Sequence, residues 1–372
     1  MPPVRKKTKQ IHVGHVAIGG DAPVSVQSMC TTRTTDPRAT VDQTLALATA
    51  GADIVRITVP DDDAAEGLAY IMWVLSSSQR PVPVIADIHF RHDLALRSLE
   101  YGVQALRLNP GNIKDAKKIR EVAREAKARG VPIRVGANAG SLHTEFLRKH
   151  GGPTPAALVE SAMWEVALLE EEGFTDIKIS VKHSDPYVMI ESYRLLSDTT
   201  DYPLHLGVTE AGTAWAGGIK SAVGIGTLLA EGIGDTIRVS LAADPLEEVK
   251  AGKQILKAVG LRREGLDVVA CPTCGRVEGD VIDLATKVEE ALAEIAAPIQ
   301  VAVMGCLVNG PGEAREADVG LALSAHGGTI FRKGQRVREV SSEEMLDALL
   351  DEARRIAEGA EEDRKHLPVV PA

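Results

Sequence analysis

Short runs of β-branched residues alternate with longer segments rich in Ala, Leu and Glu between about residues 24 and 260. This alternation is typical of repeated βα units, in which a buried strand is followed by an amphipathic helix. Each predicted strand precedes a predicted helix, and the eight strands are Val24–Met29, Ile54–Val59, Val84–Ile88, Ala105–Leu108, Ile133–Gly136, Ile177–Val181, Leu204–Val208 and Thr236–Leu241. Their number and period favour an α/β fold of the (β/α)8 TIM-barrel type. A doubly wound open sheet is the alternative, although no G-x-G-x-x-G motif follows the first strand.

The pattern changes after Leu261–Asp267. A helix, a strand, three short alternating runs and a last helix are predicted in this part, at Asp280–Ile295, Ile299–Met304, Val319–Leu323, Thr329–Arg332, Val337–Val340 and Ser342–Glu358. Together these elements predict a small α+β domain. We therefore divide the chain into a barrel domain at 1–262, a second domain at 263–360 and a charged, Pro-containing tail at 361–372.

Charge and composition narrow the classes of partner. The chain has 42 Lys and Arg against 52 Asp and Glu, and the resulting net charge of −10 repels nucleic acid and anionic lipid. Aromatic residues make up only 3% of the chain, which leaves few side chains for stacking on bases. No apolar run reaches the roughly 18 to 20 residues that span a bilayer, and Arg5–Lys9 precedes no signal-peptide core. The sequence thus predicts a cytoplasmic protein without nucleic-acid or membrane partners.

Cationic residues recur near the carboxyl ends of five predicted strands, each two or four residues from another polar residue. These polar series are Arg56 with Thr58, Arg107 with Asn109, Arg134 with Asn138, Lys178 with Ser180 and Lys182, and Arg238 with Ser240. Alternate residues of a strand point to one face, so these side chains share a face at the end where TIM barrels form their active sites. A single buried Arg is more simply explained by an internal salt bridge. Five converging cations favour a polyanion, and a diphosphate suits Arg forks and Lys point charges.

Three further residues allow two interpretations each. Glu210, just past the seventh strand, is either an acid near the cations or a helix N-terminal carboxylate favoured by the helix dipole. His89 is either catalytic or a core histidine. Cys30 is most simply a small buried residue.

The other three cysteines occur in the second domain. Cys271-Pro-Thr-Cys274 places two thiols on one turn, and Cys306 follows a predicted strand. Three thiolates with one further ligand favour an iron–sulfur cluster that keeps one iron accessible. A zinc site remains an alternative, although zinc prefers a fourth Cys or His and only His326 is near in sequence. A redox dithiol is the third possibility, although C-x-x-C occurs late in the chain for a thioredoxin-like fold.

The cysteine motifs resemble the signature of the bacterial 4-hydroxy-3-methylbut-2-enyl diphosphate synthase family. The two motifs are Cys271-Pro-Thr-Cys274-Gly-Arg276 and Gly305-Cys306-Leu-Val-Asn309-Gly-Pro-Gly-Glu313-Ala314. Four barrel segments agree with the same family: Val26-Gln-Ser-Met29, Leu108-Asn-Pro-Gly-Asn112, Val135-Gly-Ala-Asn138 and Thr209-Glu-Ala-Gly212. The resemblance covers essentially the whole chain and matches the shorter bacterial form.

The resemblance implies an oxidoreductase of the methylerythritol phosphate route to isoprenoids. Members of the family open the ring of 2-C-methyl-D-erythritol 2,4-cyclodiphosphate with two electrons, release water and form 4-hydroxy-3-methylbut-2-enyl diphosphate. Their 4Fe-4S cluster is held by three Cys and a Glu, which match Cys271, Cys274, Cys306 and Glu313 here. Flavodoxin or ferredoxin supplies the electrons. The family forms head-to-tail homodimers in which the cluster domain of one chain covers the barrel mouth of the other.

We therefore expect Arg56, Arg107, Arg134, Lys178 and Lys182 to hold the cyclodiphosphate, with Asn109, Asn138 and Ser240 as neutral donors. Glu210 is the expected proton source, and Glu313 is the expected oxygen ligand of the catalytic iron. The competing hypothesis is a TIM-barrel aldolase or hydro-lyase that acts on a sugar phosphate. It would use Lys182 as a Schiff-base amine and carry a structural zinc domain.

Overall fold

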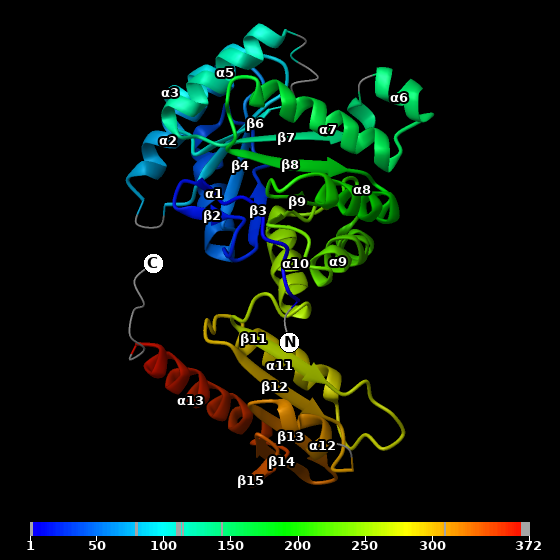
Figure 1. Ribbon diagram of the computed structural model, residues 1–372. Helices are drawn as coiled ribbons and strands as arrows, with labels where there is room; N and C mark the ends of the chain where they lie inside the picture. The colour runs from blue at the N-terminus through cyan, green and yellow to red at the C-terminus, as the bar shows by residue number, and fades with distance from the viewer. Residues whose placement is uncertain are drawn as a thin grey trace. The chain divides into compact units, whose positions relative to one another are not determined.

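The computed structural model describes residues 3–78, 81–108, 113, 115–142, 144–308 and 310–365. The chain divides between Arg262 and Arg263 into two units, and each unit has its own hydrophobic core (Figure 1). None of the described helices is both long enough and apolar enough to cross a bilayer.

The first unit is the predicted TIM barrel. Its strands are β3 (Ser25–Met29), β4 (Ile54–Thr58), β5 (Val84–Ile88), β6 (Ala105–Leu108), β7 (Ile133–Asn138), β8 (Ile177–Lys182), β9 (His205–Leu206) and β10 (Thr236–Ile237). They form one parallel sheet in the order β8-β7-β6-β5-β4-β3-β10-β9. A bridge between Ile179 and Leu204 joins the two outer strands, β8 and the segment leading into β9. This near-closed sheet confirms the barrel and removes the doubly wound alternative.

Helices follow the strands and cover the outside of the barrel (Figure 1). They are α1 (Pro37–Ala50), α2 (Asp62–Ser76), α3 (His92–Glu100), α5 (Ala116–Arg129), α6 (Thr144–His150), α7 (Pro155–Glu170), α8 (Pro186–Thr199), α9 (Ala214–Ala230) and α10 (Pro245–Ala258), with a 3-10 turn η1 at Ala139–Ser141. Asp side chains cap several of them, as Asp185 does for α8 and Asp244 for α10, and Pro occupies the first turn of both. Strand residues that point outward, such as Ile57, Val135 and Ile179, are buried against these helices.

An N-terminal hairpin that the sequence pattern did not predict packs against the barrel. Its strands are β1 (Ile11–Val13) and β2 (Val16–Ile18), each too short to show an alternating pattern. Their apolar residues form a small core with Ile54, Ile85 and Ala105, which lie within the first two residues of β4, β5 and β6. The hairpin therefore lies at the amino ends of these strands and leaves the carboxyl ends for a site.

Strands β9 and β10 are shorter than predicted, although the predicted strands begin at nearly the same residues. Regular pairing ends at Leu206 and Ile237. The Arg238 amide still donates to the Leu206 carbonyl at 3.0 Å, so the backbones stay together just beyond the regular ladder.

The second unit contains a five-stranded sheet in the order β11-β12-β13-β14-β15. Its strands are β11 (Leu266–Ala270), β12 (Ile299–Met304), β13 (Val319–Ser324), β14 (Gly327–Arg332) and β15 (Gln335–Ser341). The pairs β11–β12 and β12–β13 are parallel, and the other two pairs are antiparallel. Helices α11 (Val281–Ala291) and α13 (Met345–Lys365) share the main core of this unit with the sheet.

The second unit departs from the sequence prediction at three elements. Strand β11 was not predicted, and its residues are half-buried or exposed, so they lack a clear apolar period. Helix α13 begins later than predicted and continues to Lys365. A short helix α12 (Gly310–Glu313) and a 3-10 turn η2 (Ala314–Glu316) follow the segment that contains Cys306.

Candidate active site and cysteine cavity

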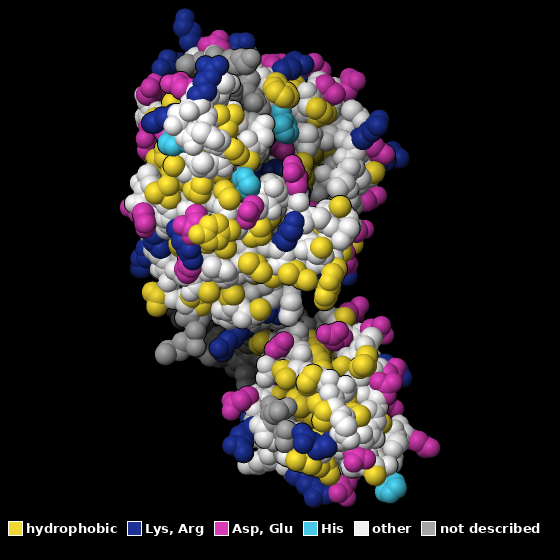
Figure 2. All heavy atoms as spheres, turned by 90° about the vertical axis from the view of Figure 1, so that its right-hand side faces the viewer, with side chains coloured by type: hydrophobic (Ala, Val, Ile, Leu, Met, Phe, Trp, Pro, Cys, Tyr) yellow, Lys and Arg dark blue, Asp and Glu magenta, His cyan; other side chains and the backbone are white. Residues whose placement is uncertain are grey.

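The inner wall of the barrel is polar and carries the predicted cations. Along β8, Ile177, Ile179 and Val181 belong to the core under the helices, so Lys178, Ser180 and Lys182 point inward. The same alternation directs Arg56, Arg107 and Arg134 inward. All five predicted cations are at least nine-tenths buried. Figure 2 shows that the barrel is hollowed on the face toward which β7 and β8 run, and basic, acidic and His side chains lie around the hollow.

Asp87 is a buried carboxylate that contacts two of these cations. Its Oδ1 accepts from Arg107 Nη1 at 3.1 Å, and its Oδ2 lies 3.5 Å from Arg56 Nε. Burial raises the pKa of Asp87, but the two arginines lower it more, to about 2. Arg56 also donates to the Met29 sulfur, at 2.8 Å from Nη2. Burial lowers the pKa of Arg56 to about 10, with Arg238 and Arg107 adding to the effect against Asp87.

Arg134 and Lys178 lie near the amino ends of their strands, although the sequence pattern predicted these cations near the carboxyl ends. Each is the second residue of its strand, and the two are register partners. Arg134 Nη1 donates to Ser180 Oγ at 2.6 Å, and Lys178 Nζ donates to Thr236 Oγ1 at 3.3 Å. Burial and the neighbouring Arg134 lower the pKa of Lys178 to about 7. Burial, then Arg56 and Arg107, lower the pKa of Arg134 well below its usual value.

Lys182 ends β8 on the same inner face. Burial lowers its pKa well below the ordinary value, and Arg134 and Arg238 lower it further. Its Nζ lies 3.5 Å from the position that a Cβ would take at Gly207, and such a Cβ would also lie only 2.7 Å from the Arg238 carbonyl oxygen. Gly207 therefore permits the close approach of β9 to β10 that leaves space for the Lys182 ammonium.

Two further predicted barrel residues, Asn138 and Ser240, follow or end their strands on the carboxyl side. Asn138 is half-buried at the end of β7 and is the register partner of Lys182. Ser240 is half-buried, and its Oγ has no hydrogen-bond partner among the described residues. Glu248 from α10 lies beside Arg238, with 3.6 Å between Oε2 and Nη2. Asn109 lies outside the described residues.

Glu210 has an unusual backbone. It is exposed and has φ of 53°, in the left-handed region that side chains other than Gly rarely adopt. It follows β9 by four residues, at the carboxyl-end rim. Strain of this kind is found mainly where the surrounding structure requires a side chain at a functional position. His89 is half-buried near Asp87, and burial lowers its pKa.

The three cysteines of the second unit line one cavity of about 180 Å³. Cys271 directly follows β11 and Cys306 comes two residues after β12, so the parallel pairing of these strands brings them to the same edge of the sheet. The Cys271 amide donates to the Val303 carbonyl at 3.0 Å. Thr273, between Cys271 and Cys274, has φ of 61°, which turns the chain tightly back. A Cβ at Gly305 would lie 3.6 Å from Cys271 Sγ and 3.0 Å from Val277, so glycine permits this close approach.

The donor set and the size of the cavity fit a polyatomic sulfur-bound group. Soft thiolates select zinc, Cu(I) or iron–sulfur clusters. The volume is several times the roughly 30 Å³ that one water occupies in the liquid, which is more than a single ion requires. Within the part of the chain that the structure describes, no three His, Cys, Asp or Glu side chains are arranged to hold one metal ion. The backbone of Glu313 ends α12, and its side chain lies outside the described part.

Cys30 behaves differently from the other cysteines. It is buried, and its Sγ lies 3.3 Å from Thr44 Oγ1. Burial raises the pKa of the thiol to about 11, against the smaller effect of the hydrogen bond. This environment agrees with a small core residue.

Two inward polar residues, Gln27 and His205, were not singled out from the sequence. They are almost fully buried on the barrel wall at 1% and 0% exposure. Both could have been found from the spacing of two that marks one face of a strand. Gln27 is two residues from Ser25 and from Met29, and His205 is two residues from Gly207.

Comparisons with known proteins identify the family of the chain. Residues 8–253 match the GcpE TIM-barrel domain, and residues 267–355 match the GcpE protein C-terminal domain. A protein of Frankia casuarinae is 55% identical over 355 residues, which cover 95% of this chain and 91% of the relative. A protein of Geobacter sulfurreducens is 56% identical over 353 residues, which cover 95% of this chain and 99% of the relative. Both are named 4-hydroxy-3-methylbut-2-en-1-yl diphosphate synthase (flavodoxin).

Solved structures support the fold of the first unit. A type I 3-dehydroquinate dehydratase from Clostridium difficile superposes with a TM-score of 0.50 at 13% identity, over 68% of this chain and 97% of that one. At this identity the likeness shows the fold alone, so it does not favour the aldolase or hydro-lyase hypothesis. Because both GcpE domains and relatives above half identity span nearly the whole sequence, the chain belongs to the 4-hydroxy-3-methylbut-2-en-1-yl diphosphate synthase family.

Proposed function

We propose that this chain catalyses the reductive ring opening and dehydration of 2-C-methyl-D-erythritol 2,4-cyclodiphosphate to 4-hydroxy-3-methylbut-2-enyl diphosphate. The reaction consumes two electrons and the protons that release a hydroxyl group as water. The observation that carries the proposal is the convergence of Cys271, Cys274 and Cys306 on one cavity. A redox centre held by these three cysteines would deliver the two electrons that the family reaction consumes.

The proposed cofactor is a 4Fe-4S cluster held by Cys271, Cys274, Cys306 and Glu313. Such a cluster supplies electrons one at a time. The three sulfurs belong to residues that line one cavity, which supports the ligand assignment. Glu313 follows Cys306 through a Gly- and Pro-rich segment and ends the short helix α12. A carboxylate is the ligand in this set that binds soft iron least strongly.

The proposed substrate site is the inner wall of the barrel. Arg56, Arg107, Arg134, Lys178 and Lys182 would hold the diphosphate, with Asn109, Asn138 and Ser240 as neutral donors. The charges support this role, because the cations lower one another's pKa values and the buried Asp87 faces two of them. A diphosphate would offset that repulsion and accept charge-assisted hydrogen bonds.

Glu210 is the proposed proton source. Its position at the rim and its left-handed backbone support a role at the mouth rather than in the fold. General acids in such positions typically accelerate a reaction by about 100- to 10,000-fold.

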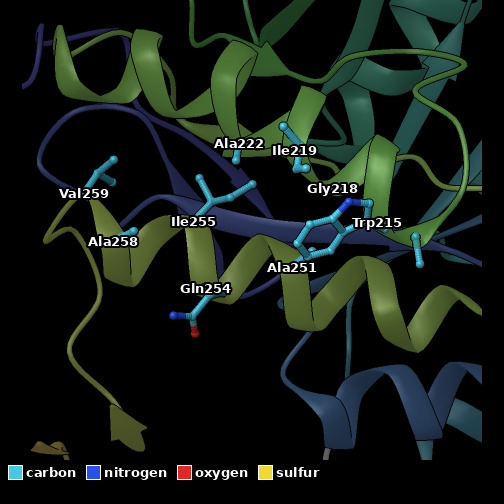
Figure 3. A pocket seen from close by; sticks show the side chains of 10 residues that line it. Trp215, Gly218, Ile219, Ala222, Ala251, Gln254, Ile255, Ala258 and Val259 are labelled. Atoms are coloured by element: carbon cyan, nitrogen blue, oxygen red, sulfur yellow. The ribbon is translucent and has the colours of Figure 1, made fainter. Parts of the chain in front are cut away.

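The proposed partners are reduced flavodoxin or ferredoxin as electron donor and a second copy of the chain in a head-to-tail homodimer in the cytoplasm. The names of the relatives include flavodoxin, which supports the donor. An apolar groove of about 340 Å³ between α9 and α10 offers a surface for the second copy (Figure 3). Trp215 and Ile219 are 80% and 49% exposed there, and Ile255 lines the groove from α10. Obligate homodimer interfaces are apolar in this way.

The test is anaerobic reconstitution with iron and sulfide, followed by turnover with the cyclodiphosphate and reduced flavodoxin. We expect a brown protein whose product, identified by mass spectrometry, is 4-hydroxy-3-methylbut-2-enyl diphosphate and whose formation requires the reductant. A colourless zinc protein that converts a sugar phosphate without reductant would contradict the proposal.

A further inference from the structure

His205 is a buried histidine to which the proposed reaction assigns no role. It is 0% exposed inside the barrel, and neither Nδ1 nor Nε2 has a hydrogen-bond partner among the described residues. Its backbone is held firmly, because the Tyr193 hydroxyl of α8 donates to the His205 carbonyl and accepts from the Val181 amide at 3.2 Å. The ring therefore occupies a defined place on the inner wall.

The strand register places His205 between two cation–hydroxyl pairs. Thr236 is its partner on β10, and the bridge from Ile179 to Leu204 brings Ser180 beside it on β8. Ser180 accepts from Arg134, and Thr236 accepts from Lys178. The next residue on the same side, Gly207, comes directly after β9, and the Lys182 Nζ lies 3.5 Å from the position that a Cβ would take there. His205 thus lies among the cations proposed to bind substrate.

Two other polar groups on this wall, like the His205 ring, are buried without a hydrogen-bond partner among the described residues. Gln27 is 1% exposed, and both its amide nitrogen and its amide oxygen lack a partner among the described residues. Arg134 Nε lacks one in the same part of the structure. Burying a polar group without a hydrogen-bond partner is destabilising, so several such groups in one barrel interior indicate partners that are not protein side chains.

The charges around His205 keep its ring neutral. Burial lowers its pKa well below the ordinary value, and the groups that face it, Arg134, Lys182, Lys178 and Arg56, all lower it further. A neutral imidazole has one nitrogen that donates and one that accepts. The acceptor nitrogen suits a water that itself accepts from a cationic N–H.

We infer that His205 and Gln27 hold ordered water inside the barrel and, through it, position Lys182 and Arg134 for the diphosphate. Polar interiors bind water where it finds two to four partners, and His205 and Gln27 each offer a donor and an acceptor on the inner wall that also carries Lys182 and Arg134. His205 is a positioning residue in this arrangement. The inference rests on the proposed function, since it concerns how the same site is oriented toward the cyclodiphosphate.

The test removes hydrogen bonding while keeping shape. His205→Phe keeps a ring without nitrogens, Gln27→Met keeps a side chain of similar length without the amide, and His205→Gln keeps one donor and one acceptor. The matched control is Ser192→Ala, which removes a fully buried hydroxyl that bonds to the Val188 carbonyl within α8. Binding of the cyclodiphosphate is measured by calorimetry on the cluster-loaded, oxidised protein without reductant, together with the thermal midpoint of each variant.

We expect Kd to rise at least tenfold in His205→Phe and Gln27→Met, and to stay within about threefold of the parent in His205→Gln and Ser192→Ala. Folded His205→Phe and Gln27→Met variants that bind like the parent would overturn the inference. So would a His205→Gln variant as weak as His205→Phe, because shape rather than hydrogen bonding would then decide. If His205→Phe does not fold, the affinity of Gln27→Met decides alone. A parent protein that does not bind the cyclodiphosphate would overturn the proposed function instead, and the inference with it.

Discussion

Asp87 on β5 accepts a hydrogen bond from Arg107 on the neighbouring strand β6, with 3.1 Å between Oδ1 and Nη1. The two residues are register partners, so the pairing follows directly from the alignment of the strands. Both side chains are more than nine-tenths buried. The barrel therefore holds an ion pair within a wall that otherwise carries mainly positive charge.

Acid stability depends on Asp87. Its pKa is about 2 in the folded protein, against roughly 3.9 when unfolded, so its contribution is present above pH 4 and is lost as the pH falls toward 2. Asp87→Asn should lower the free energy of unfolding at pH 7 by about 2–3 kcal/mol. In this variant the free energy of unfolding should also fall less steeply between pH 4 and pH 2. Denaturant melts from pH 2 to pH 7 measure both effects. If the free energy of unfolding of the variant fell between pH 4 and pH 2 as steeply as that of the parent, the ion-pair assignment would be wrong.

Lys178 also makes stability rise with pH, but in the range above neutral and because its charged form is disfavoured in the folded protein. Burial and Arg134 lower its pKa to about 7, against roughly 10.4 when unfolded, so the unfolded chain binds more protons and stability rises as the pH increases from 7 to 10. Lys178→Met should stabilise the protein at pH 7, by about 1–4 kcal/mol, because it removes a costly buried charge. The same variant should bind the cyclodiphosphate more weakly. Thermal melts at pH 7 and calorimetry measure the two effects, and a Lys178→Met variant that is less stable than the parent would contradict the burial cost.

The inner-wall cations should contribute to substrate affinity. Arg107→Ala and Lys182→Ala each remove a charge-assisted phosphate contact, which is worth about 1.5–3 kcal/mol, or roughly 10- to 150-fold in Kd. Arg124→Ala on α5, whose side chain is 64% exposed, is the control and should bind like the parent. Calorimetry with the cyclodiphosphate distinguishes them. Parent-like binding by both inner-wall variants would make these cations purely structural.

The cysteines should differ in their effect on iron content. Cys271→Ser, Cys274→Ser and Cys306→Ser should lose most of their iron and sulfide, because a hydroxyl is a poor substitute for a thiolate. Cys30→Ser should keep both, since Cys30 packs beside Thr44 in the barrel core. Iron and sulfide analysis after anaerobic reconstitution measures this. Stoichiometric iron in Cys306→Ser would remove Cys306 from the ligand set.

Glu210 allows a test that separates stability from turnover. Glu210→Gly relieves the left-handed backbone, so the variant should fold at least as stably as the parent. It should lose turnover by about 100-fold or more if the carboxyl group delivers a proton. Calorimetric binding should change little. A variant with parent-like turnover would exclude Glu210 as the proton source.

The sequence by itself determined which side chains face the interior of the barrel. Arg56, Arg107 and Lys182 alternate with apolar residues at a spacing of two, and that spacing has only one physical meaning in a strand. It also determined that two cysteines share one turn, at Cys271 and Cys274. Both conclusions rest on local covalent geometry, which is present in the order of the residues.

The tertiary structure alone decided which side chains contact one another and how residues far apart in the chain come together. Lys178 lies against Thr236 and Arg238 lies beside Glu248, because strand register and helix packing set these contacts. Cys306 lines the same cavity as Cys271 because β11 pairs with β12. The hydrophobic pattern did not predict β11. Contacts between residues far apart in the chain depend on how separate elements pack, and a periodic pattern within one element carries no record of that.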